Sequence, residues 1–323
     1  MRRAAGFSLI ELMIAMAVGL GLVAAVSLMF ASTRGARAEL ERTGRMVDNG
    51  RYAQDLLAED LRLAGYWGEL PLATFATVVP DPCATVPAAL GWRAAAPATV
   101  PAPVVGHGDG AEPIPECLPD RLPGTDVVVV RRVATDTTPL GALAAGAPYL
   151  QASRCPSDVE PFAMATTAAG LPLRNANCTG PIDPRGLVVR LYYVARCNDC
   201  GRDAVPTLKR AELRAERLVV VPLVEGVENL RVDHGFDVDG DGVADRYLRG
   251  RSGVAGQADD DWGNVVAVRV HLLVRTAELP VGHVDRATYR LGLSGEVGPF
   301  GDGFKRTAFA SAVRLVNPAG RRE

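Results

Sequence analysis

The residues best placed to bind a ligand form an acidic run at positions 237–245, with the sequence DVDGDGVAD. Carboxylates stand at its first, third, fifth and ninth positions and a glycine stands at the sixth, as at the start of an EF-hand calcium loop. Alternate residues of such a loop converge on one point, and these hard oxygen donors suit Ca²⁺. The expected ligands are the carboxylates of Asp237, Asp239, Asp241 and Asp245 and the backbone carbonyl of Val243.

The acidic run departs from an EF-hand in two respects. Its twelfth position is Leu248 and not a bidentate glutamate, and a strand-like segment at residues 229–236 precedes it where an EF-hand has a helix. We therefore expect a short calcium loop of another kind, completed by water or by one of Asp259, Asp260 and Asp261. The alternative is a polar hairpin turn that holds no metal.

A single carboxylate, Glu11, interrupts an otherwise apolar stretch at residues 7–30. As an α-helix this stretch is about 36 Å long, which is enough to cross the hydrocarbon core of a bilayer. An unpaired carboxylate in hydrocarbon is costly, so Glu11 predicts a functional contact. Arg2 and Arg3 precede the stretch and predict a cytoplasmic leader with the rest of the chain outside.

Two simpler explanations of the N-terminus fit less well. The apolar stretch is too long for a secretory signal peptide, and no site of the small-x-small type ends it. A plain membrane anchor leaves Glu11 unexplained.

The chain contains six cysteines, all beyond the apolar stretch, which favours an oxidising compartment with up to three disulfides. Sequence alone leaves many pairings open, and we predict that neighbours pair because each bridge then closes one loop. The cysteines are Cys83, Cys117, Cys155, Cys178, Cys197 and Cys200. The last two form a lone CxxC with no second ligand pair nearby, so a disulfide at a hairpin tip is favoured over a zinc or redox site.

Other catalytic and binding patterns are missing from the sequence. The four histidines have no metal-ligand spacing, and there is no nucleophile elbow, phosphate loop or dinucleotide fingerprint. The formal net charge is −2 and no basic stripe is present, which argues against nucleic acid as a main partner.

Periodicity predicts the elements that carry these residues. A helix continues through residues 31–65 with an amphipathic pattern, since apolar or small residues recur there at three- and four-residue steps. Residues 66–323 then form a β-rich head, irregular at 71–123, with strands expected at 125–134, 186–195, 217–224, 264–276, 287–293 and 307–317. The predicted class is α+β, with a long N-terminal helix packed on an antiparallel sheet and with disulfide-stapled loops.

The N-terminal residues GFSLIEL, at positions 6–12, resemble the type IV prepilin signature. The resemblance implies a leader at residues 1–6, cleavage after Gly6 by prepilin peptidase and N-methylation of Phe7. It also implies that Glu11 pairs with the Phe7 amino group of a neighbouring subunit during assembly, which would make two costly charges tolerable in lipid.

Four further segments resemble PilW-type minor pilins: residues 49–66, 223–232, 264–270 and 313–317. This resemblance implies a non-enzymatic minor pilin of type IV pilus assembly, acting in a priming or tip complex with other minor pilins, the major pilin and a tip adhesin. Such a protein is anchored once in the inner membrane with a periplasmic head and later joins the pilus at the cell surface. The alternatives are a minor pseudopilin of a type II secretion system and, from another class, a membrane-anchored periplasmic enzyme or calcium-dependent binding module.

Overall fold

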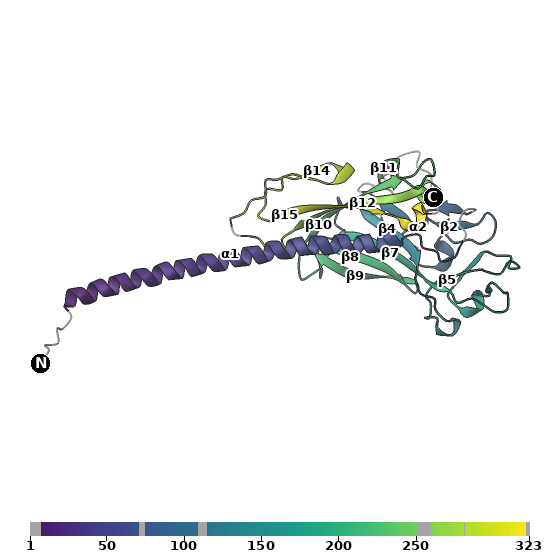
Figure 1. Ribbon diagram of the computed structural model, residues 1–323, viewed down its shortest axis with the longest axis horizontal. Helices are drawn as coiled ribbons and strands as arrows, with labels where there is room; N and C mark the ends of the chain where they lie inside the picture. The colour runs from purple at the N-terminus through teal and green to yellow at the C-terminus, as the bar shows by residue number, and fades with distance from the viewer. Residues whose placement is uncertain (1–7, 71–74, 109–114, 251–259, 281, 321–323) are drawn as a thin grey trace. The chain divides into compact units, whose positions relative to one another are not determined.

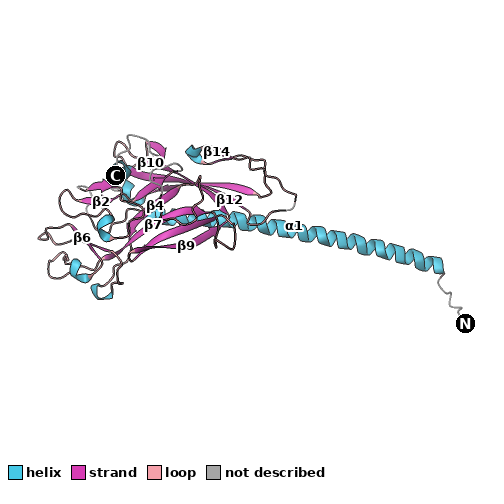
Figure 2. Ribbon diagram, turned by 180° about the vertical axis from the view of Figure 1, so that it is seen from behind, coloured by secondary structure: helices cyan, strands magenta, loops and turns pink. Residues whose placement is uncertain are grey.

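A computed structural model describes residues 8–70, 75–108, 115–250, 260–280 and 282–320. The chain divides into two compact units, Met1–Arg45 and Met46–Glu323. One helix, α1 (Leu9–Leu63), belongs partly to each unit, and the β-strands all lie in the second (Figures 1 and 2).

The first unit consists mainly of the apolar part of α1. Its large apolar side chains from Leu9 to Phe30 are exposed, so no part of the described chain covers them. Among the described residues, α1 is the one helix that is long and apolar enough to cross a membrane. The apolar run ends where the Arg34 guanidinium lies 4.3 Å from the centre of the Phe30 ring.

The second part of α1 packs into the head by one face. The apolar or small residues that the sequence places on this face are buried, which confirms the amphipathic pattern; they are Met46, Gly50, Ala53, Leu57, Leu61 and Ala64. Gly50 lies so close to the Phe309 ring that an added Cβ would overlap it. The small residue therefore sets how closely helix and strand approach.

The end of α1 is fixed by two distant segments. Gly65 has φ +71°, a left-handed conformation that suits the residue after a helix, and its N–H donates to the carbonyl of Arg131 at 2.9 Å. The Asn317 side chain donates to the carbonyls of Leu63 and Ala64, at 3.4 and 3.2 Å. The C-terminal segment thus satisfies carbonyls that the helix leaves without partners.

The head contains two main sheets. In the larger one, the order β3–β4–β7–β5–β6 is extended by β8 on β7 and β9 on β8. Its strands are β3 (Val104–His107), β4 (Val127–Val133), β5 (Tyr149–Ala152), β6 (Phe162–Ala165), β7 (Arg185–Ala195), β8 (Thr207–Arg214) and β9 (Arg217–Glu225). The described pairs of this sheet are all antiparallel.

The second sheet has four antiparallel strands in the order β11–β10–β12–β15. They are β10 (Val227–Phe236), β11 (Arg246–Arg249), β12 (Val265–Arg275) and β15 (Arg306–Arg314), and the short helix α2 (Val316–Ala319) follows. Two small ribbons complete the head, β1 (Ala76–Val78) beside β2 (Thr99–Pro101) and β13 (Tyr289–Arg290) beside β14 (Glu296–Val297). The α+β class is confirmed.

Three buried aromatic residues pack together at β6 of the larger sheet. Trp67 meets Trp92 edge-on with ring centres 4.9 Å apart, and Trp92 meets Phe162 at 5.3 Å. Such edge-to-face pairs add to the burial of large apolar surfaces. These contacts join Trp67, just after α1, to Trp92 and Phe162, which lie in segments where the sequence predicted no strand.

Most of the predicted strands are present, and the errors have physical reasons. The strand expected at 287–293 is wrong: only Tyr289 and Arg290 pair, because this segment is held to the sheet by side chains and not by a ladder. The region 71–123, expected to be irregular, contains β1, β2 and β3. β8 was missed because its Lys209 and Arg210 resemble surface residues, although Lys209 is buried.

Candidate functional site

The first residues of α1 form a reciprocal cap around Glu11. The N–H of Ser8 donates to Glu11 Oε2 at 2.9 Å, and the N–H of Glu11 donates to Ser8 Oγ at 3.2 Å. This is a capping box, in which two N–H groups that the helix cannot pair are satisfied by side chains. The Ser-x-x-Glu spacing of residues 8–11 is the sequence signal for such a cap, and the sequence analysis did not use it.

The cap places a carboxylate at the very start of the helix. It lies beside the backbone of Ser8, the residue next to the predicted mature N-terminus. Gly6 and Phe7 themselves lie outside the described residues, so cleavage and methylation there stay predictions. A carboxylate oxygen that accepts one N–H still has capacity for a cation from another chain.

The acidic loop connects β10 to β11, which pair as an antiparallel hairpin. The carboxylates of Asp237, Asp239 and Asp245 each offer an oxygen within 4.8 Å of the other two. Gly240 and Gly242 have φ +86° and +82°, conformations that glycine adopts without strain. These two residues permit the tight turn that brings the three carboxylates together.

Backbone groups of the loop hold these carboxylates. Asp237, which is buried, accepts the N–H of Gly240 at 2.7 Å and that of Gly242 at 2.9 Å. Asp245 accepts the N–H of Val238 at 2.6 Å. The same hydrogen bonds would stabilise a turn without a metal, so they are compatible both with a Ca²⁺ loop and with a polar hairpin turn.

Asp241, the fourth carboxylate expected to bind the ion, lies outside this group. Its carboxylate accepts the N–H of Val243 at 2.8 Å. Leu248, which stands where an EF-hand has its bidentate glutamate, lies on β11 opposite His234. Asp259 is outside the described residues, and Asp260 and Asp261 stand in the short helix η5 (Asp260–Asn264).

The six cysteines form the three neighbour pairs that the sequence predicts. Cys83 bonds Cys117, Cys155 bonds Cys178 and Cys197 bonds Cys200, with Cα–Cα distances of 5.7, 5.1 and 5.1 Å. No free cysteine remains. Each bridge closes one loop and so restricts the unfolded chain.

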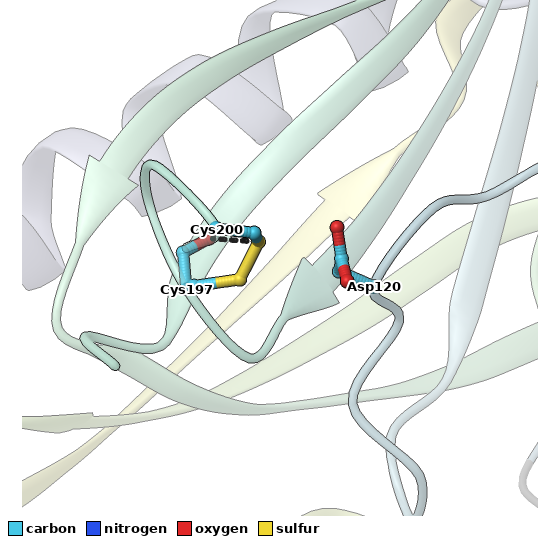
Figure 3. A group of neighbouring side chains, drawn as sticks. All are labelled: Asp120, Cys197 and Cys200. Atoms are coloured by element: carbon cyan, nitrogen blue, oxygen red, sulfur yellow. Dashed lines mark hydrogen bonds between the residues drawn. A yellow bond between two sulfur atoms is a disulfide. The ribbon is translucent and has the colours of Figure 1, made fainter. Parts of the chain in front are cut away.

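The third disulfide lies beside Asp120, whose carboxylate is within 4.8 Å of both sulfur atoms (Figure 3). It sits in the connection between β7 and β8, as expected for the tip of a hairpin. A disulfide sulfur is not a thiolate, so this group lacks the donors that zinc requires. The bridge is structural in this arrangement.

An ion cluster that the sequence analysis missed joins α1 to the larger sheet. The Asp60 carboxylate, almost fully buried, accepts from Arg132 Nε and Arg190 Nη1 at 3.0 Å each and from the Tyr192 hydroxyl at 2.8 Å. Burial, together with the nearby Asp60 charge, raises the pKa of Tyr192 above its usual range, so this hydroxyl stays protonated and donates. The partners come from two strands that are distant in the sequence from Asp60, β4 and β7, so no local pattern could reveal the cluster.

A second ion cluster holds the segment between β12 and β15. Arg306, whose side chain is 1% exposed, contacts Glu228 at 2.5 Å, Asp285 at 2.9 Å and Asp302 at 2.6 Å. Hydrogen bonds from Arg306 lower the pKa of Asp302, against the effect of its burial. Burial acts to raise the pKa of Asp285, but bonds from the Ala287 N–H and Arg306 outweigh it and lower that pKa.

Two histidines of the second sheet differ in their surroundings. His271 lies 3.1 Å from the buried Asp233, which also accepts the N–H of Leu293 at 3.1 Å. His234 is fully buried against Trp262, and burial lowers its pKa to about 4 although Asp233 acts in the opposite sense. Neither arrangement presents a histidine to solvent as a catalytic base.

Two family models match the chain. Type IV Pilus-assembly protein W matches residues 191–317, which run from β7 to α2 and include the acidic loop. The Prokaryotic N-terminal methylation motif matches residues 1–27, which include Gly6, Phe7 and the cap at Glu11.

Other comparisons are more distant. No curated protein matches the chain significantly. Among solved structures, a type IV-like pilin from Thermus thermophilus is similar with a TM-score of 0.38 and 14% identity, over 85% of this chain and 97% of that one.

Proposed function

Because the chain is a PilW-type minor pilin of type IV pilus assembly, we propose that it acts in the complex that primes the filament and remains near its tip. Pilin-family membership supports association with other pilus components in general. The specific partners that we propose are other minor pilins, the major pilin and a tip adhesin. The role is structural, as the pilin family suggests, and no reaction is assigned to it.

The observation that carries this proposal is the cap at the start of α1. The Glu11 carboxylate is held by the Ser8 N–H at the end of an exposed apolar helix. An amino group on Phe7 of a neighbouring subunit would find there a fixed opposite charge in a medium of low dielectric, where such a pair is strong. The filament would thus recognise each incoming subunit both by its apolar helix and by the charged amino group of its N-terminus.

We further propose an inner-membrane location with a periplasmic head before assembly, and the pilus afterwards. The prepilin-type motif and the apolar helix support membrane anchoring. Three disulfides in the head fit an oxidising compartment. Prepilin peptidase would act on the cytoplasmic side, where Arg2 and Arg3 hold the leader.

The acidic loop is proposed as a structural Ca²⁺ site of the head. Three carboxylates converge there and repel one another unless a cation is bound. The ion would offset this repulsion and fix the hairpin between β10 and β11. Its contribution would be to the stability of the head and not to a reaction.

A gene deletion tests the assembly function directly. Loss of this chain should strongly reduce surface pili, and the full-length gene supplied in trans should restore them. Secretion of type II substrates is scored in the same strains, because a pseudopilin would lower secretion and leave pili normal. Normal piliation in the deletion strain would contradict the proposed function.

A further inference from the structure

One edge of the second sheet is open in the described part of the chain. β15 pairs with β12 on one side and with no other described strand on the other. It is nine residues long, and between Arg306 and Arg314 it contains neither a proline nor a charge. A long edge of this kind is a template for another strand unless something protects it.

The hydrogen-bond register shows which backbone groups face this edge. The N–H of Thr276 donates to the carbonyl of Lys305 at 3.0 Å, and the N–H of Leu315 donates to the carbonyl of Val266 at 2.8 Å. In an antiparallel pair the bonded positions alternate, so every odd-numbered residue between these two faces β12. The even-numbered residues Ala308, Ala310 and Ala312 therefore point their N–H and C=O groups away from the sheet.

These three alanines are also exposed. They lie opposite Leu273, His271 and Arg269 on β12, on the face away from Phe309 and α1. No hydrogen bond joins their outward backbone groups to another described residue. Backbone and side chains at this edge are thus both accessible.

The other sheet edges are protected or short. β9, the other long edge strand, contains Pro222 and a register irregularity opposite Lys209, which are common ways to block strand addition. The remaining edge strands, β3, β6 and β11, have four residues each. Among the described edge strands of the two main sheets, β15 alone is longer than four residues and has neither a proline nor a register irregularity.

We propose that β15 is an assembly edge that accepts a β-strand from the head of a different pilus subunit. This proposal rests on the proposed function, which places the heads of other pilus components beside this one. The added strand would bond to the backbone of Ala308, Ala310 and Ala312, as in other cases of strand addition. It would carry larger apolar or β-branched side chains opposite the alanines, which leave room for them.

A second copy of the chain fits the edge less well. Antiparallel self-pairing centred on Ala310 would set Ala308 of each copy against Ala312 of the other. Alanine pairs contribute least among cross-strand pairs, whereas aromatic or β-branched partners add to the stability of the sheet. Size complementarity therefore favours a different chain as the partner.

The test compares Ala310→Pro with Ala310→Ser in the full-length protein. Proline removes one outward N–H and no bond to β12, so it is tolerated at this edge of the sheet but obstructs an added strand. We expect Ala310→Pro to lower the amount of the chain in sheared filaments about tenfold, while its membrane level and melting temperature stay close to those of Ala310→Ser. Equal incorporation of the two folded variants would overturn the proposal.

A second measurement does not depend on proline. A photo-cross-linking amino acid at position 312 of the full-length chain should link to a strand of a different pilus subunit, identified by peptide mass. A link to a second copy, or to a segment that is not a strand, would overturn the choice of partner. If the unsubstituted chain is itself absent from filaments and its deletion leaves pili normal, the proposed function fails instead, so the two failures are distinguishable.

Discussion

The Asp60 carboxylate on α1 accepts a hydrogen bond from the Tyr192 hydroxyl on β7, 132 positions away in the chain, at 2.8 Å. The same carboxylate pairs with Arg132 and Arg190, and its side chain is only 4% exposed. A buried charge of this kind is tolerable because three donors surround it. It joins the C-terminal part of α1 to β4 and β7.

Replacing Asp60 should strongly destabilise the head. Asp60→Ala leaves two largely buried guanidinium groups without their carboxylate, and breaking such a cluster costs about 3 kcal/mol or more. The measurement is thermal or urea unfolding of the full-length protein in detergent. Asp55→Ala is the matched control, because Asp55 lies on the exposed face of the same helix and should change stability by less than about 0.5 kcal/mol. Equal effects of the two substitutions would contradict the assigned role.

The head should lose stability in mild acid because His234 is buried in its neutral form. Its pKa is about 4 in the folded protein and 6.5 in its ordinary state, so the unfolded chain binds the proton more readily. The neutral histidine contributes fully to the free energy of unfolding above pH 6.5. This contribution is lost as the pH falls towards 4, and the loss is at most about 3 kcal/mol. Asp285 and Asp302, whose pKa values are lowered, lose their contribution only below their ordinary value of 3.8.

Unfolding at a series of pH values checks the role of His234. In His234→Gln the slope of stability between pH 6.5 and 4 should be largely absent, whereas His283→Gln should retain it. A slope that is the same in His234→Gln and in the unsubstituted protein would show that another group is responsible.

For the acidic loop, the structure and the sequence motif predict different effects of substituting Asp239 and Asp241. The motif treats Asp239 and Asp241 alike, but only Asp239 belongs to the group of three convergent carboxylates. Asp239→Asn should therefore weaken Ca²⁺ binding by about tenfold or more, the effect of losing roughly 1.4 kcal/mol, and Asp241→Asn should weaken it less. Calorimetric titration of the full-length protein with Ca²⁺ gives both values. The absence of heat, together with a melting temperature that chelator does not change, would count against the site.

The sequence predicted the features that depend on neighbouring residues. The apolar helix, the amphipathic face of residues 46–64 and the strands with alternating apolar positions follow from local periodicity, and the neighbour disulfides close short loops. The functional contact expected at Glu11 follows from the same kind of local evidence, a carboxylate within an apolar stretch, and it stays a prediction. Its cap with Ser8 is also local, because the two residues are three positions apart, but the sequence analysis did not identify it.

The features that the sequence did not predict depend on distant contacts. Asp60 finds its partners on β4 and β7, and Arg306 finds Glu228 on β10, so neither cluster has a signature in one stretch of chain. β8 carries charges at positions that would be exposed on an isolated strand, but its neighbours bury Lys209 and half-bury Arg210 and Glu212. The outward backbone of β15 follows from its register with β12, which exists only in the folded sheet.

The central claim, that the chain enters a filament through Glu11, is tested most directly by its amount in sheared pili. Glu11→Gln keeps an oxygen that can accept the Ser8 N–H, so the helix cap survives while the charge is lost. Ser8→Ala removes one half of the cap and keeps the charge. Both variants should remain in the membrane at normal levels. The account predicts that Glu11→Gln is depleted from sheared pili by about tenfold or more, as expected for a charge pair in lipid, and that Ser8→Ala is nearly normal. Normal incorporation of Glu11→Gln would contradict it.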